Sequence, residues 1–177
     1  MGLPEDLLEQ AKDLAGFEAK KPKQASLRRA VSASYYALFH LLVRACAQVL
    51  APGGSQLLRG RLSRVLDHTE MADACKRFSV WDTNQPPSLY QAFFPQGPST
   101  NLRKVSSSFI ELQQQRHVAD YDLTRSFLRS QVLEVIDRAE ESFELFNSLQ
   151  NDCEERKVFL LALVFHRRLS KGSRYQG

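Results

Sequence analysis

One segment constrains the fold more than any other, because residues 26–50 carry apolar side chains at helical spacing on two faces. Ser26 is a suitable N-cap for this helix, and Pro52-Gly53-Gly54 ends the pattern. A helix that is apolar on two sides is buried on two sides, so we expect a central helix that packs in its own core or also against a second subunit. One face holds Leu27, Val31, Ser34, Leu38, Leu41, Leu42, Ala45 and Val49, and the other holds Tyr36, Phe39, His40 and Val43.

The rest of the chain has the same helical periodicity. Ser55 is placed to cap a helix, and no segment shows the alternation of a strand, an internal repeat or a long heptad run. The sequence therefore predicts an all-α protein, a bundle of five or six helices with one long loop. The further helices are expected over 3–16, 56–78, 101–121, 124–149 and 152–169.

The predicted loop over 79–101 combines helix-breaking prolines, among them Pro86 and Pro87, with aromatic residues. A long loop of this kind either packs onto the bundle or contacts a partner. We favour an insertion that covers the ends of the bundle. The alternative is a lid or partner-binding segment in which Tyr90, Phe93 and Phe94 stack on bases or fill a groove.

Length and charge agree with a single domain over residues 1–177. The formal net charge of +4 allows an anionic partner such as RNA without requiring one. The longest apolar run, 158–165, is far shorter than the ~20 residues of a membrane span, and the N-terminus lacks the pattern of a secretory signal. Three widely spaced cysteines without a CxxC pair predict buried, reduced thiols, no metal site and a cytoplasmic location. No membrane contact is expected, because no apolar run is long enough to span a bilayer.

No Gly-rich phosphate loop or hydrolase motif is present, so no cofactor is predicted. Arg116 instead draws attention, because it continues the apolar stripe that includes Leu112 and Ala119. An inward arginine is costly unless it is paired. Asp120, one turn later, is the nearest carboxylate, and Tyr121 and Asp122 could add acceptors at the end of the helix. Arg116 therefore either pins this helix to the bundle or lies in a crevice where it binds phosphate.

A second polar group lies on the central helix, where Ser32, Tyr36 and His40 are each one turn apart. Small residues beside aromatic ones are typical of close helix packing. Imidazole is also the side chain best suited to proton transfer near neutral pH, so His40 is a candidate for catalysis as well.

Together the two segments resemble the HEPN family (higher eukaryotes and prokaryotes nucleotide-binding). The resemblance rests on Tyr35-Tyr36-Ala37-Leu38-Phe39-His40 followed by Arg116-x-x-Ala119-Asp120-Tyr121-Asp122, as in small stand-alone prokaryotic members. It covers a core of about residues 5–147 and leaves the loop and the last helix as additions. It implies an up-and-down helical bundle, a homodimer and association with RNA. Many members are metal-independent endoribonucleases of toxin–antitoxin or defence systems, some are paired with a small nucleotidyltransferase, and others are non-catalytic RNA- or protein-binding modules.

The family's catalytic signature matches this chain only in part. Arg116 stands at the arginine and His117 at the polar position after it, but Tyr121 stands where the second histidine would be. Tyrosine, with an ordinary pKa of about 10, is a poor base. His117 points about 100° around the helix from Arg116, so a second subunit or a distorted helix end would have to bring the two together.

The resemblance therefore implies Arg116, His117 and Tyr121 as catalytic residues. The supporting residues are Tyr36, His40, Asp120 and Asp122. The alternatives are a non-catalytic interaction module with a structural Arg116–Asp120–Tyr121 cluster, or a helical scaffold without a nucleic-acid role. Arg59, Arg61 and Arg64 are interpreted as a solvated face.

Overall fold

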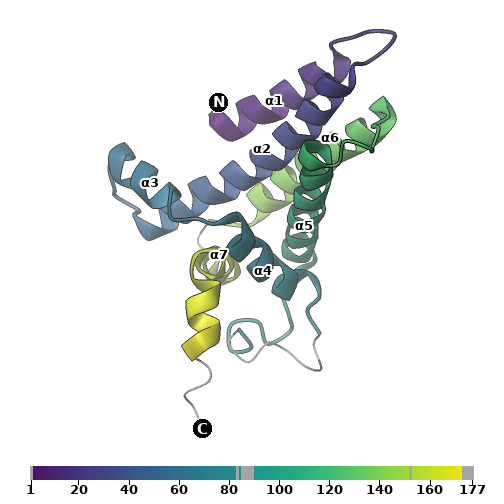
Figure 1. Cartoon of the computed structure of the whole chain (residues 1–177). Coiled ribbons are helices and arrows are strands. Elements are labelled where there is room, and N and C mark those ends of the chain that lie inside the picture. Colours follow the sequence, from purple (N-terminus) through teal and green to yellow (C-terminus); the bar gives the residue numbers. More distant parts are fainter. Residues whose placement is uncertain (1, 83, 85–89, 152, 173–177) are drawn as a thin grey trace. The chain divides into compact units, whose positions relative to one another are not determined.

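The structure, a computed structural model, describes the whole chain except residues 1, 83, 85–89, 152 and 173–177 and the side chains of 169–172. Every regular element among the described residues is a helix, which confirms the all-α class (Figure 1). The described part of the chain forms seven helices, where the sequence predicted five or six. They are α1 (Leu3–Gly16), α2 (Gln24–Leu50), α3 (Gln56–Ser63), α4 (His68–Ser79), α5 (Thr100–Tyr121), α6 (Arg129–Ser148) and α7 (Glu154–Gly172).

The additional helix arises because the segment predicted as one helix over 56–78 is divided. Asp67 is the N-cap of α4, and its Oδ1 accepts hydrogen bonds from the backbone N–H groups of Thr69 at 2.9 Å and Glu70 at 3.0 Å. The backbone of Asp67 is extended, with φ −108° and ψ 132°, so a continuous helix cannot pass through it. Ser55 caps α3 as predicted, since its side chain accepts from the N–H of Leu58.

Two other predicted helix starts are wrong by a few residues. α2 begins at Gln24, so Ser26 lies inside the helix, and its hydroxyl donates to Glu18 Oε1 at 3.0 Å. α6 begins at Arg129 and not at Thr124. The side-chain amide of Gln24 donates to the carbonyl of Phe127 at 2.9 Å and accepts from its N–H at 2.8 Å. Both backbone polar groups of Phe127 are therefore bound to Gln24. They are not available for the hydrogen bonds of a helix that begins at Thr124.

The chain divides into two compact units, each made of two separate stretches of sequence. Unit 1 contains the residues up to Leu41 together with Ser108–Glu144. Unit 2 contains Leu42–Ser107 together with the residues from Leu145 onward. The single domain over 1–177 stays a prediction.

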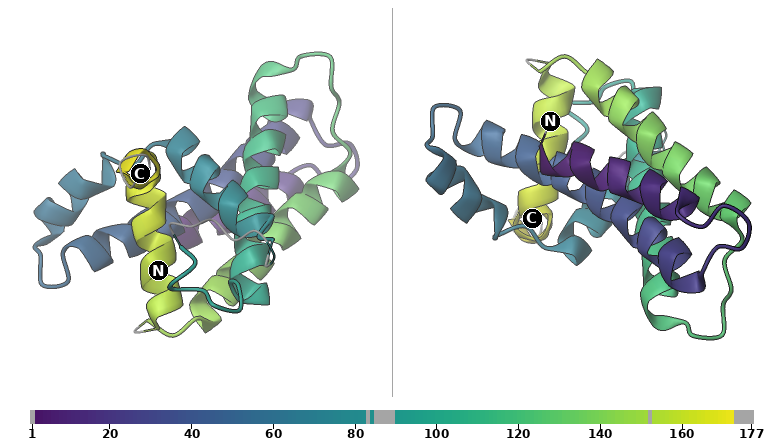
Figure 2. Two further views of the ribbon diagram at one scale, coloured as in Figure 1. Left: turned by 90° about the horizontal axis from the view of Figure 1, so that it is seen from below. Right: turned by 90° about the horizontal axis from the view of Figure 1, so that it is seen from above.

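Unit 1 is built from α1, the first part of α2, the second part of α5 and most of α6. Tyr35 of α2 is fully buried, and its ring lies 5.7 Å from that of Phe109 of α5. Figure 2 shows α1 and α6 side by side, where Lys12 and Glu140 form an ion pair. The predicted burial of α2 on two sides is confirmed, because between residues 30 and 41 only Tyr36 and His40 are not buried.

Unit 2 has an aromatic core around Phe78 of α4, which packs against α7. The described residues between α4 and α5 contribute to it, and the prediction that this segment packs onto the helices is confirmed for Trp81, Tyr90 and Phe94. Tyr90 and Phe94 are therefore not available to stack on bases, whereas Phe93 is 46% exposed. Pro86 and Pro87 lie outside the described residues. The rings around Phe78 are those of Trp81, Tyr90, Phe94 and Phe159, with centroids 5.2–6.2 Å away.

Two further expectations concern α2 and the cysteines. Among the described helices, α2 is long and apolar enough to cross a membrane, although 83% of its most apolar stretch is buried, as in the core helix of a soluble protein. Cys46 and Cys75 are buried free thiols, as predicted, and burial raises the pKa of both. The prediction of a buried thiol is wrong for Cys153, which is half-buried because it immediately precedes α7 and does not lie within the helix.

Candidate functional site

The candidate site lies in unit 1, where a polar row on α2 faces the last turns of α5. Ser32, Tyr36 and His40 are spaced four residues apart, so they share one face of an otherwise apolar helix. Arg116 and Asp120, also four residues apart, face them from α5. We call these five residues the Arg116 cluster.

The guanidinium of Arg116 is held from two sides. Its Nε lies 2.7 Å from Asp120 Oδ2 in an ion pair, and its Nη2 donates a hydrogen bond of 2.9 Å to the hydroxyl of Tyr36. The side chain is 25% exposed. Burial opposes the charge, but the oxygens of the neighbouring tyrosines and of Asp120 outweigh it and raise the pKa of Arg116. The arginine is therefore a fixed cation that is still accessible from solvent.

Asp120 joins the two helices through both of its carboxylate oxygens. While Oδ2 faces Arg116, Oδ1 accepts a hydrogen bond of 2.6 Å from the hydroxyl of Ser32. The predicted pairing of Arg116 with Asp120 is confirmed. The pair costs less to half-bury than either charge alone, because each charge has a partner.

His40 continues the same row of α2 beyond Tyr36. Its ring is stacked on that of Tyr36 with centroids 6.3 Å apart, and it meets the edge of Phe39 at 5.2 Å. Burial lowers the pKa of His40 below its ordinary value of 6.5. His40 is therefore neutral at pH 7, which suits a proton acceptor better than a phosphate-binding cation.

His117 and Tyr121 form the exposed edge of the site. The two rings are 4.9 Å apart, and Tyr121 is 64% exposed. The Tyr121 ring also lies 5.6 Å from the guanidinium carbon of Arg116. Although Arg116 and His117 leave α5 in different directions, one aromatic ring contacts both within a single chain.

The remaining predicted site residue, Asp122, directs its carboxylate away from the Arg116 cluster and its exposed edge, toward the turn after α5. Its Oδ1 accepts from the N–H and the hydroxyl of Thr124, at 2.9 and 2.6 Å, and from the N–H of Arg125. These hydrogen bonds lower the pKa of Asp122. Its carboxylate therefore stabilises the turn after α5.

Sequence reasoning missed Arg28, which lies one turn before Ser32 in the same row. Its Nη1 donates to the carbonyl of Ala119 at 2.7 Å, and its Nη2 donates to the carbonyls of Asp122, at 2.9 Å, and Arg125. A cation at this position donates hydrogen bonds to carbonyls at the C-terminal end of α5 and interacts favourably with the negative end of the helix dipole. The sequence did offer one indication of this role, because Arg28 lies four residues before Ser32 and therefore on the same face of the helix.

The site lies at the basic end of unit 1. The segments 17–29 and 114–129 together contain eight Lys or Arg residues and three Asp or Glu residues, so their net charge of +5 exceeds the +4 of the whole chain. Arg129 brings the two segments together, because its guanidinium donates to the carbonyls of Glu18 and Ala19. In both views of Figure 2 the loops that follow α1 and α5 lie at the same end.

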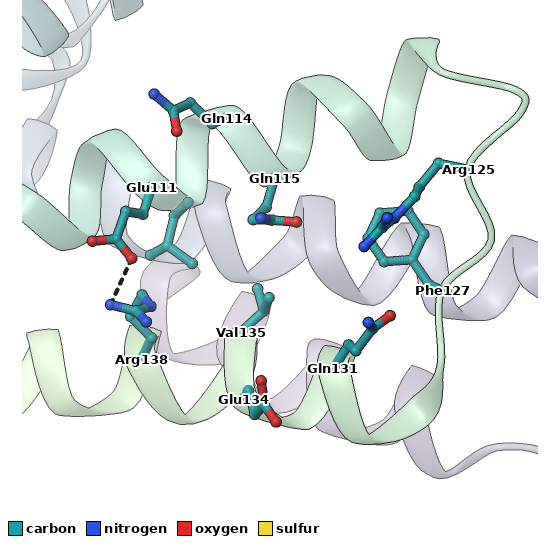
Figure 3. Close-up of a pocket in the computed structure, with 10 residues that line it drawn as sticks. Glu111, Gln114, Gln115, Arg125, Phe127, Gln131, Glu134, Val135 and Arg138 are labelled. Atoms are coloured by element: carbon teal, nitrogen blue, oxygen red, sulfur yellow. Dashed lines mark ion pairs between the residues drawn. The ribbon is translucent and has the colours of Figure 1, made fainter.

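A polar groove of about 230 Å³ lies between α5 and α6 in the same unit. Arg125 and Phe127 close one end of it, and Glu111 and Arg138 form an ion pair of 2.7 Å across it (Figure 3). Between these two ends lie the amide side chains of Gln115 and Gln131 (Figure 3), and Gln114 also lines the groove. These groups offer both donors and acceptors to a ligand.

Among the described residues, no group of three His, Cys, Asp or Glu side chains is placed to hold a metal ion. The chain matches no family model, no curated protein and no solved structure.

Proposed function

We propose that this chain is an RNA-associated protein of the HEPN type, in which the basic end of unit 1 binds the backbone of single-stranded RNA. The observation that carries the proposal is the guanidinium of Arg116, which is oriented by Tyr36 and Asp120 and remains accessible. Within the described part of the chain its Nη1 donates no hydrogen bond, so this nitrogen is available to a phosphate oxygen.

The groups around Arg116 fit the same ligand. Lys20, Lys21 and Lys23 are exposed on the loop after α1 and add positive charge to the same end of the unit. Phosphate neutralisation supplies most of the affinity of such interfaces. The exposed ring of Tyr121 offers a surface on which a base can stack, which is worth about 1–3 kcal/mol per base.

The proposal is tested by fluorescence anisotropy with a labelled single-stranded RNA in the presence of EDTA. We expect Arg116→Gln to weaken binding about tenfold. Arg103→Gln, an exposed arginine near the other end of α5, removes the same charge and is expected to change binding less than twofold. Tyr121→Ala keeps the Arg116–Asp120 pair and is expected to weaken binding several-fold. Equal affinities for all four proteins would refute RNA binding at this site.

A second candidate function is metal-independent cleavage of the bound RNA, favoured by the contact of Tyr121 with both His117 and Arg116. The 2′-hydroxyl would attack the adjacent phosphorus and expel the 5′-oxygen, leaving a 2′,3′-cyclic phosphate and a 5′-hydroxyl. The imidazole of His117 would accept the proton of the 2′-hydroxyl and return it to the leaving 5′-oxygen, and Arg116 would stabilise the charge on the phosphate.

Cleavage is tested by incubating the protein with RNA in EDTA and analysing the ends of the products. We expect His117→Asn to abolish cleavage while binding is retained within threefold. If the wild-type protein binds RNA and releases no product with these ends, it is an RNA-binding module and not a nuclease.

A further inference from the structure

Arg156, near the start of α7 in unit 2, is buried, with only 8% of its surface exposed, and lines a cavity of about 460 Å³. Two carbonyls at the end of α6 accept hydrogen bonds from it, that of Phe146 at 3.1 Å and that of Leu149 at 2.8 Å. The guanidinium carbon lies 4.1 Å from the centre of the Phe146 ring. The arginine is thus held rigidly at the cavity wall.

The charge of Arg156 has no carboxylate partner among the described residues. Carbonyl dipoles offset only part of the cost of burying a guanidinium, since a full negative charge is what such a group ordinarily pairs with. Both hydrogen bonds to described residues come from Nη1. Nε and Nη2 donate no hydrogen bond to a described residue. Their N–H bonds form the edge of the guanidinium that binds a carboxylate through two parallel hydrogen bonds.

The remaining wall of the cavity is divided between apolar and polar groups. The polar side chains of Gln48, Asn151 and Lys157 can hydrogen-bond a charged headgroup. The volume falls in the range of about 300–1,000 Å³ of small-molecule sites. The apolar part of the wall consists of Ala45, Val49, Pro52 and Leu160.

We propose that this cavity binds a small amphipathic carboxylate, whose headgroup pairs with Nε and Nη2 of Arg156 while its apolar body lies against Val49 and Leu160. The site belongs to unit 2 and uses none of the residues of the Arg116 cluster. It is therefore independent of the proposed RNA binding.

The test is isothermal titration of the full chain with octanoate as the probe, beside octanol and inorganic phosphate. We expect saturable binding of octanoate and at least tenfold weaker binding of the other two. Octanol lacks the carboxylate that pairs with Arg156, and phosphate lacks the apolar chain that lies against the cavity wall. Equal binding of octanol would show that the guanidinium has no part in the site. Equal binding of phosphate would show that the apolar wall has none, and an absence of saturable octanoate binding would overturn the proposal.

Two variants locate the site. Arg156→Gln is expected to weaken octanoate binding at least tenfold, and Arg168→Gln, an exposed arginine of the same helix, to leave it unchanged. Because Arg156→Gln also removes the hydrogen bonds to the end of α6, Val49→Phe is the second variant, which fills the cavity without touching the arginine. If Val49→Phe remains folded and binds octanoate as the wild-type protein does, the ligand is not in this cavity.

Discussion

At the scale of single residues, Arg28 holds the end of α5 that carries Arg116 and Asp120. Its hydrogen bonds to the carbonyls of Ala119 and Asp122 are charge-assisted, and bonds of this kind contribute about 1.5–3 kcal/mol. We expect Arg28→Ala to lower the free energy of unfolding by about 2 kcal/mol. For a chain of this length that lowers Tm by roughly 4–8 °C.

The matched control is Arg29→Ala, which removes the same side chain from the next, exposed position of α2. Thermal unfolding followed by circular dichroism measures both variants. The same loss of Tm in the two proteins would show that Arg28 contributes only its charge and not its contacts with α5.

His40 makes the stability of the fold depend on pH. Its pKa is lowered in the folded protein, so below the ordinary value of 6.5 the unfolded chain binds the proton more tightly than the folded one. Stability therefore falls as the pH decreases through that range and recovers above it. We expect the fall in Tm between pH 7.5 and pH 5.5 to be smaller in His40→Gln than in the wild-type protein.

His166 of unit 2 is expected to make stability fall at low pH in the same way, because burial also lowers its pKa. The pH series is therefore repeated with His166→Gln and with the double variant, in which we expect the smallest fall. A wild-type slope that survives in the double variant would assign the pH dependence to other groups.

At the scale of elements, the boundary between α3 and α4 depends on the cap provided by Asp67. Loss of an N-cap side chain costs about 1 kcal/mol, and asparagine caps as well as aspartate does. We expect Asp67→Ala to lower the free energy of unfolding by about that amount in chemical denaturation, and Asp67→Asn to have little effect. Equal losses would assign the effect to the charge of Asp67 and not to its hydrogen bonds.

The helices differed in how far the sequence could predict them. Asp67 with Glu70 three residues later is a recognisable capping signal, so the division of the segment 56–78 was open to prediction. The start of α6 was not, because the side chain that binds the backbone of Phe127 comes from Gln24, about a hundred residues earlier. Local periodicity contains no information on such a contact.

The candidate site shows the same limit. The pairing of Arg116 with Asp120 is local, one turn apart on one helix, and the sequence predicted it. The contacts of Arg116 with Tyr36 and of Asp120 with Ser32 join two helices, so only the fold brings them together. The homodimer, the nucleotidyltransferase partner and the cytoplasmic location stay predictions.

At the scale of the whole molecule, the positive charge is concentrated at one end of unit 1. The logarithm of RNA affinity should fall with the logarithm of salt concentration, by about 0.7 for each phosphate contacted on a single strand. In the triple variant Lys20→Gln, Lys21→Gln, Lys23→Gln we expect the magnitude of this slope to be smaller by up to about 2. Anisotropy at several salt concentrations measures the slope.

A second triple variant controls for net charge. Arg61→Gln, Arg64→Gln and Arg103→Gln remove three exposed positive charges from unit 2. If the slope falls equally in both variants, the net charge of the chain and not the basic end of unit 1 determines binding. An unchanged slope in this control agrees with the interpretation of the α3 arginines as a solvated face.

The central claim, that RNA lies against the Arg116 cluster, is tested most directly by photocrosslinking. A single-stranded RNA containing 4-thiouridine is irradiated with the full chain in EDTA, and the modified residues are mapped by mass spectrometry. We expect adducts on Tyr121 and His117, the exposed rings of the site, and their loss in Arg116→Gln. Adducts confined to unit 2, or an undiminished yield in Arg116→Gln, would contradict the claim.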